Sequence, residues 1–111
     1  MWTTPEELAL LVCAIVDAWN GEPDTLLSQE LARGMTRGWG CEETVGLGVF
    51  LDEPEAEPCF VSQGWGVGFQ CKLVAYPRLR RGLVVMTNSD PGLTQNQALA
   101  GEVIRALGFA G

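Results

Sequence analysis

Apolar residues recur at helical spacing near the start of the sequence. The stretch opens with Thr4-Pro5-Glu6-Glu7, which is typical of a capping box with proline in the first turn. Asn20-Gly21 then supplies a stop signal. The pattern predicts a helix over residues 4–20, and its additional apolar residues favour burial on nearly all sides. The residues at helical spacing are Leu8, Leu11, Val12, Ile15, Val16 and Trp19, and the additional ones are Leu10, Cys13 and Ala14.

A shorter helix and a change of period follow. Ser28 is a good N-cap for a helix over residues 28–34, which ends near Gly34. Apolar residues then alternate with glycines and Phe50 over residues 44–51, and this two-residue period predicts a strand. The acidic, proline-rich run 52–58 predicts a solvated hairpin loop, because its carboxylates lack the spacing of a calcium loop.

The second half of the sequence is typical of a sheet followed by a helix. Strands are predicted over residues 59–63, 68–76 and 82–88, and the last is a continuous apolar run that favours burial on both faces inside a sheet. A closing helix is predicted over residues 94–107, ending at Gly108. The apolar face of that helix comprises Leu99, Ala100, Val103, Ile104 and Leu107.

This order of elements predicts the fold class. Helices, then strands, then a helix favour an α+β fold: an antiparallel sheet of three to four strands, with an N-terminal buried helix and a C-terminal helix packed on it. At 111 residues the chain is long enough for one hydrophobic core, so residues 1–111 are expected to form a single domain.

The net charge argues against two classes of partner. Seven basic residues against fourteen acidic ones give a net charge of −7, which opposes approach to nucleic acid and to anionic membranes. Arg78, Arg80 and Arg81 lie between Pro77 and Gly82, so we interpret them as a solvated hairpin turn. Trp2-Thr3-Thr4-Pro5 lacks the basic start of a signal peptide, and Leu8–Val16 is too short to span a bilayer. We expect a soluble chain and favour the cytoplasm.

The residue types present exclude several site chemistries. Histidine is absent, so no imidazole base or histidine metal ligand exists. Cys13, Cys41, Cys59 and Cys71 show no Cys-x-x-Cys spacing; Cys59 with Cys71 is one conceivable pair among several, and free thiols are expected. No metal and no cofactor are predicted.

The sequence shows no motif for an activated nucleophile or for dinucleotide binding. None of the three serines, Ser28, Ser62 and Ser89, has a lysine one helical turn away to accept its proton. The sole lysine, Lys72, alternates onto the polar face of its strand, where a solvated side chain is favoured over a ligand contact. The glycine cluster Gly64–Gly68 precedes a strand and not a helix, which argues against dinucleotide binding. The paired carboxylates fall in a cap, a turn and a loop, so no general acid-base pair is predicted.

Three stretches carry a resemblance to a known family. They are Trp2–Ala9 followed by Leu26-Leu27-Ser28, then Val45–Phe50, and then Gly64–Asp90. Together, in this order and spacing, they are similar to the C-terminal part of the class C β-lactamase, D-alanyl-D-alanine carboxypeptidase and esterase family. Within the third stretch, Gly68–Pro77 and Gly82–Asp90 resemble the last two strands of that family. The resemblance runs from Trp2 almost to the C-terminus.

The resemblance implies where a site would lie. In the family, the strand before Gly68 carries a Lys-Thr-Gly or His-x-Gly box that lines the active site, and the matching residues here are Ser62-Gln63-Gly64. Ser62 therefore replaces the basic residue. The next residue, Trp65, matches the donor of an oxyanion-hole amide. We expect Ser62, Gln63, Gly64 and Trp65 to form a vestigial ligand-binding box, with no catalytic residue, because the family's Ser-x-x-Lys and Tyr-x-Asn precede everything in this chain.

Two hypotheses of function follow from the resemblance. The first is a non-catalytic β-lactamase-like module that acts by ligand binding or protein assembly, with a purely structural oligomer as a variant. The second is a fragment or split half of a serine hydrolase whose nucleophile lies outside this chain. The family's sheet has a further strand beside the one matched by Leu83–Asn88, and without it an apolar edge is left unpaired. We therefore expect a homodimer, or another chain paired with this edge.

Overall fold

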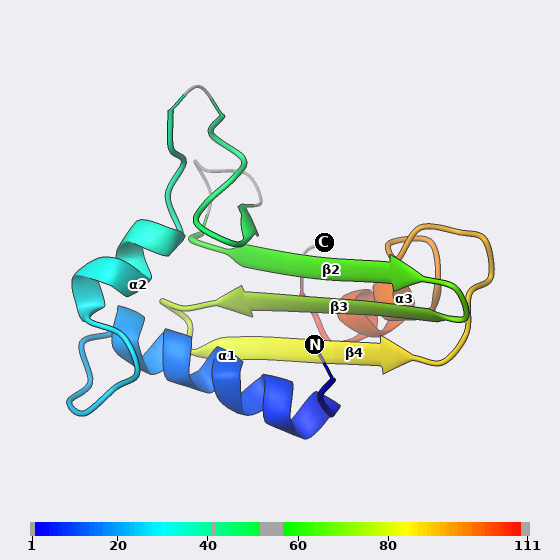
Figure 1. Ribbon diagram of the computed structural model, residues 1–111, viewed down its shortest axis with the longest axis horizontal. Coiled ribbons are helices and arrows are strands. Elements are labelled where there is room, and N and C mark those ends of the chain that lie inside the picture. The colour runs from blue at the N-terminus through cyan, green and yellow to red at the C-terminus, as the bar shows by residue number, and fades with distance from the viewer. Residues whose placement is uncertain (1, 41, 52–56, 110–111) are drawn as a thin grey trace.

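The first two helices begin at the predicted capping residues. The computed structural model describes residues 2–40, 42–51 and 57–109 (Figure 1). Helix α1 (Pro5–Trp19) begins in the predicted capping box: the Thr4 hydroxyl accepts from the Glu7 amide, and the Glu7 carboxylate accepts from the Thr4 amide, both at 3.2 Å. Helix α2 (Gln29–Met35) begins at Ser28, whose hydroxyl accepts from the Leu31 amide.

The sheet is antiparallel throughout and its strands lie in chain order, β1-β2-β3-β4. Each strand pairs with the next along the chain, and helix α3 follows the last strand. The predicted α+β class is confirmed. The bounds are β1 (Phe50–Leu51), β2 (Phe60–Gly66), β3 (Phe69–Tyr76), β4 (Arg81–Thr87) and α3 (Leu99–Ala106).

Helices lie on both faces of the sheet: in Figure 1, α1 is in front and α3 is behind. Alternate strand residues supply two separate cores, since successive side chains point to opposite faces. On the α1 face, Val12, Val16, Leu51, Phe60 and Ala75 are buried together. On the α3 face, Cys59, Val74, Ile104 and Phe109 form the second core. Both α1 and α3 contact β3 and β4.

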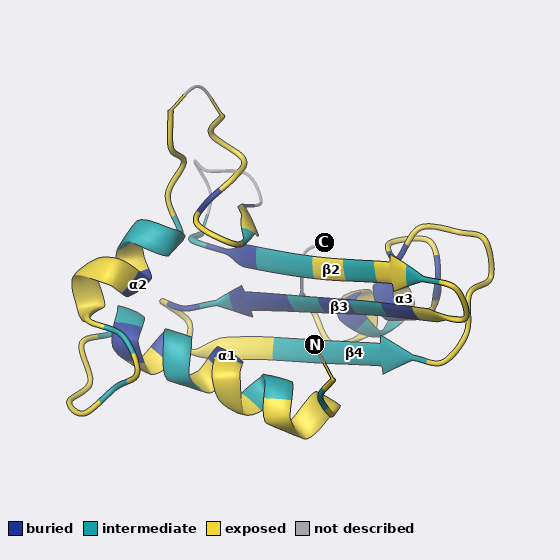
Figure 2. Ribbon diagram, in the orientation of Figure 1, coloured by how far each residue is buried: buried dark blue, intermediate teal, exposed yellow. Residues whose placement is uncertain are grey.

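Helix α1 is less buried than its pattern predicted. Only Val12, Val16 and Ala18 are buried, while Leu10 is 69 % exposed (Figure 2). Leu11 and Cys13 are exposed as well. The prediction was wrong because the described residues place α1 on the outside of the sheet, where just one stripe of the helix meets other elements.

The predicted strand over residues 44–51 is mostly a turn. Only Phe50 and Leu51 join the sheet, and a single bridge links Val45 to Phe50. The Gly46 amide donates to the Val49 carbonyl, which folds the segment back on itself. Gly48 has a left-handed φ of +75°, and a strand has no place for it. The alternating glycines therefore indicated a tight turn and not an extended chain.

Two further element bounds differ from the prediction. Strand β2 extends to Gly66, beyond the predicted 59–63, because Gly64 and Gly66 pair with Cys71 and Phe69 of β3. The closing helix, predicted over residues 94–107, begins only at Leu99. The preceding residues form a turn in which the Gly101 amide donates to the Gln95 carbonyl.

Strand β4 is the edge strand of the described sheet and not an interior one. Residues 83–87 are half-buried, as the teal ribbon of β4 in Figure 2 shows. The prediction from the apolar run Leu83–Met86, burial on both faces inside the sheet, was therefore wrong, because these residues are only half-buried. It did not indicate that the outer side of the strand lacks a described neighbour.

None of the helices in the described ranges combines the length and the apolar character that crossing a bilayer requires. The acidic loop predicted over residues 52–58 lies largely outside the described residues, since residues 52–56 are not described.

Helix α1 packs closely on the backbone of β4 at Gly82, where an added Cβ would lie 2.8 Å from Cγ1 of Val12. We predict that Gly82→Ala lowers the free energy of unfolding by about 1–3 kcal/mol, because α1 must shift away from the sheet. Urea denaturation measures the change.

A second substitution separates this cause from a general weakening of β4. Val12→Ala removes the clashing methyl group, so Gly82→Ala in that background should cost less than it does alone. Additive losses in the double variant would contradict the proposed contact.

Candidate functional site

Strand β2 carries all four residues of the predicted ligand-binding box. Ser62 pairs with Leu73, and Gly64 pairs with Cys71. Because side chains alternate along a strand, Ser62 and Gly64 face the α1 side of the sheet, as Phe60 does. Gln63 and Trp65 face the α3 side. The box residues therefore do not converge on one pocket, and only Ser62 presents a polar side chain to the α1 side.

The outer edge of β2 is open beside this box. Strand β1 pairs only with Phe60 and Val61 of β2. From Ser62 to Gly66, no described strand pairs with the outer side of β2. An extended segment of a ligand or a partner chain could therefore form backbone hydrogen bonds here.

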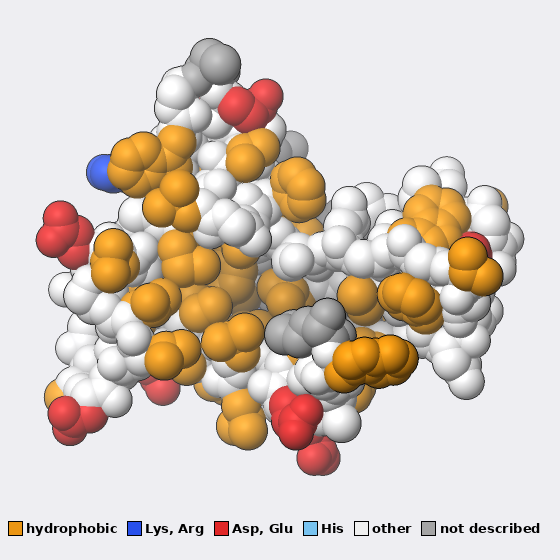
Figure 3. Space-filling view, in the orientation of Figure 1, with side chains coloured by type: hydrophobic (Ala, Val, Ile, Leu, Met, Phe, Trp, Pro, Cys, Tyr) orange, Lys and Arg blue, Asp and Glu red, His pale blue; other side chains and the backbone are white. Residues whose placement is uncertain are grey.

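A groove opens on the α1 side of the sheet, next to the box. Its cavity volume is about 500 Å³, and none of the four box residues lines it. Figure 3 shows apolar side chains gathered over this face. The lining residues are Trp2, Thr3, Phe69, Gln70, Cys71, Met86 and Thr87. The sequence alternation placed Phe69 and Cys71 on one strand face, but it gave no sign that this face stays uncovered.

Glycines allow neighbouring side chains to pack directly on the β2 backbone beside this groove. An added Cβ at Gly66 would lie 2.3 Å from the ring of Phe69, which folds over the strand at that point. At Gly64 an added Cβ would lie 2.9 Å from Sγ of Cys71. The dense glycines of this segment therefore permit close packing within the β2–β3 hairpin.

Ser62 is half-buried and has no base beside it among the described residues. Its hydroxyl forms no hydrogen bond with another described group. Lys72, the residue type that could accept its proton, faces the other side of the sheet and donates to Oδ1 of Asn96. The expectation of a solvated Lys72 is wrong, because this residue is only 5 % exposed.

A polar clamp accounts for the burial of Lys72. The segment between β4 and α3 crosses the α3 face of the sheet, where Gln70 donates to the Leu93 carbonyl. A second hydrogen bond runs from the crossing segment to the sheet: Nε2 of Gln95 donates to the Gly64 carbonyl of β2 at 2.9 Å. Gln70 and Gln95 are both buried, and their hydrogen bonds satisfy polar groups that would otherwise be costly to bury. The clamp fixes the β2 backbone from behind the box.

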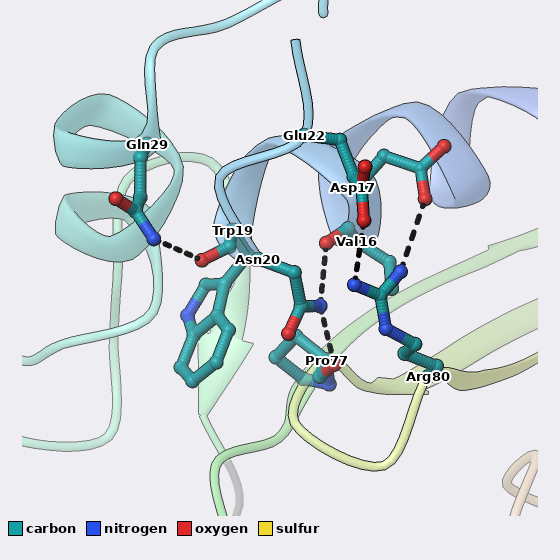
Figure 4. A network of polar contacts seen from close by, with 8 residues as sticks. All are labelled: Val16, Asp17, Trp19, Asn20, Glu22, Gln29, Pro77 and Arg80. Atoms are coloured by element: carbon teal, nitrogen blue, oxygen red, sulfur yellow. Dashed lines mark hydrogen bonds and ion pairs between the residues drawn. The ribbon is translucent and has the colours of Figure 1, made fainter.

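The arginine cluster is engaged within the chain. The Arg80 guanidinium bridges Glu22 at 2.8 Å and Asp17 at 3.7 Å (Figure 4). Arg78 pairs with Glu57, and Arg81 donates to the Leu107 carbonyl. These contacts agree with the interpretation of the cluster as a hairpin turn without a phosphate site.

Asn20 completes the attachment of this hairpin to α1. Its Nδ2 donates to the carbonyls of Val16 and Pro77, each at 2.8 Å, and so joins the end of the helix to the turn after β3 (Figure 4).

Carboxylates and thiols form no catalytic or metal-binding set in the described ranges. Both the hydroxyl and the amide of Thr44 donate to Glu42, and these hydrogen bonds lower the pKa of the Glu42 carboxyl below its usual value. Residues 2–40, 42–51 and 57–109 contain no cluster of three potential metal ligands. Among the described residues, Cys13, Cys59 and Cys71 form no disulfide, and Cys41 lies outside the described residues.

No family model, no curated protein and no solved structure matches this chain. The resemblance to the β-lactamase-like family therefore rests on the motifs of the sequence.

The polar clamp behind the box gives a prediction for Gln95. Replacing it by methionine leaves the Gly64 carbonyl without its donor, so Gln95→Met should lower the free energy of unfolding by about 1–2 kcal/mol in chemical denaturation. Gln97→Met is the matched control, because Gln97 lies two residues away and is exposed; it should change stability by less than about 0.5 kcal/mol. Equal losses in the two variants would contradict the clamp.

Proposed function

We propose that this chain is a non-catalytic β-lactamase-like module that acts by assembly, through the outer edge of β4. One observation carries the proposal: β4 is an apolar strand with a helix over each of its faces, yet no described strand pairs with its outer side. Residues Leu83–Met86 carry no charge. Proteins ordinarily protect an exposed edge with charges, prolines or bulges, and this edge has none of them over those four residues.

The two helices strengthen the argument. Helices α1 and α3 both contact β4, one on each face of the sheet. A further strand paired with β4 would therefore lie between two helices that are already in place. A cavity of about 170 Å³ lies here, between α1 and the first half of β4. Its lining combines apolar residues such as Ala9, Leu83 and Val84 with the charged residues Asp17, Arg80 and Arg81. An added strand would bury the apolar part of this surface, which favours association.

The box on β2 is proposed as a second, ligand-binding element of the module. Ser62, Gln63, Gly64 and Trp65 match an active-site strand by resemblance. The open outer edge of β2 and the groove on the α1 side support binding of a small molecule or an extended segment there. With Ser62 in the position of the basic residue and Lys72 on the opposite face, binding without turnover is the function that this arrangement favours.

The alternative function is a fragment or split half of a serine hydrolase. The uncovered groove on the α1 side favours it, because an element outside this chain could bring a nucleophile to that face. A longer coding sequence with Ser-x-x-Lys and Tyr-x-Asn upstream of Trp2 would support this alternative.

The assembly hypothesis predicts concentration-dependent association of the pure chain in sedimentation velocity. Met86→Lys places a charge on the edge strand and should weaken association at least about tenfold. Phe69→Lys is the matched control, because it adds the same charge to the same groove, but on interior strand β3. Circular dichroism checks that both variants fold.

Three outcomes are informative. Weaker association of the Met86 variant alone supports pairing through the β4 edge. Equal weakening by both variants indicates the groove as the interface and contradicts the proposal, as does a strict monomer at the highest concentration.

The absence of a base beside Ser62 gives a catalytic prediction. The pure chain should hydrolyse a chromogenic cephalosporin and a short-chain nitrophenyl ester no faster than its Ser62→Ala variant does. Turnover that disappears in this variant would overturn the non-catalytic proposal and favour the hydrolase alternative.

A further inference from the structure

We infer that the partner at the β4 edge is a second copy of this chain, paired antiparallel about a two-fold axis near Val85 and Met86 of the strand. The inference rests on the assembly function proposed above and names its partner. Two features support it: the opposite charges near the two ends of β4, and the small residues Ala9 and Cys13 on the side of α1 next to this strand.

The charges are complementary only when the two strands run antiparallel. Arg81 is the first residue of β4, and Asp90 lies three residues after its end at Thr87. Both are exposed, and neither has an oppositely charged partner among the described residues. Antiparallel pairing of two copies brings Arg81 of each toward Asp90 of the other. Parallel pairing would align like charges instead.

The middle of the edge is complementary to itself as well. Leu83–Met86 is uncharged, so two copies meet through apolar side chains and backbone hydrogen bonds. A two-fold interface needs such self-complementarity, because the same surface serves both partners. An unrelated chain would have to supply an acidic and a basic end at the same spacing, whereas a second copy has them already.

Helix α1 gives independent support. Ala9 and Cys13 line the cavity beside β4, so this side of the helix overlooks the junction. In the two-fold pair, the α1 helices of both copies lie on the same face of the continuous sheet. They meet there through the small side chains of Ala9 and Cys13, which allow close approach. The pairing thereby explains why Cys13 is exposed on a helix of apolar pattern.

Cysteine cross-linking tests this geometry in the intact chain. A short bismaleimide should join two copies through Cys13 at concentrations where the chain associates in sedimentation. Cys13→Ser should abolish the cross-linked dimer. Cys71→Ser is the matched control and should leave the yield unchanged, because Cys71 lies on interior strand β3.

Charge reversal tests the orientation. Asp90→Arg should weaken association about five- to tenfold, because the ion pair occurs twice in a two-fold dimer. Adding Arg81→Glu should restore association, provided that circular dichroism shows a folded double variant. If Arg81→Glu unfolds the chain, through loss of its contacts with Leu107 and Phe109, the cross-linking result decides alone.

The outcomes separate this inference from the proposed function. Association that depends on Met86, but without a Cys13 cross-link, overturns the two-fold geometry and leaves assembly through the edge in place. A strict monomer overturns both. A cross-link that persists in Cys13→Ser comes from another thiol and likewise overturns the geometry.

Discussion

The contact between Val12 and Gly82 determines how the rest of the molecule is arranged. Because residue 82 has no side chain, α1 can settle directly on the backbone of β4, the last strand of the sheet. The helix is thereby committed to the edge strand, and Phe69 and Met86 at the far ends of β3 and β4 stay uncovered on that face. The close approach of α1 to Gly82 thus accounts both for the helix over one face of β4 and for the open groove beside Phe69 and Met86.

Local signals in the sequence predicted most of the fold. The Thr4 and Ser28 caps located two helix starts, and alternation located β3 almost to the residue. Failures occurred at turns, one closed by a local hydrogen bond and one held by a distant contact. Gly46 and Gly48 mimicked a strand period, although the first donates to Val49 within a tight turn. Residues 94–98 carried a helical pattern, but the hydrogen bonds of Gln95 to Gly64 and Gly101 hold them in a turn.

That residues 62–65 form a ligand site stays a prediction, and their orientation was not predictable from the sequence. Matching to a family box selected residues 62–65, and the structure places them on a strand with an open outer edge. Alternation along β2 separates Ser62 from Trp65 onto opposite faces, which a linear motif does not express. Burial of Lys72 was not predictable either, because it depends on Asn96, which lies 24 residues further along the chain.

The two open edges of the sheet differ in chemistry, and this difference assigns them different roles. The β2 edge offers a glycine-rich backbone with Ser62 and Gln63, so hydrogen bonding dominates there and a passing ligand gains little from apolar burial. The β4 edge offers a run of four apolar side chains between two helices, so lasting association releases more free energy there than at β2. An apolar edge left permanently in water would favour aggregation. This liability is the physical reason for the proposal that a partner covers β4, and it holds whether or not the box on β2 binds a ligand.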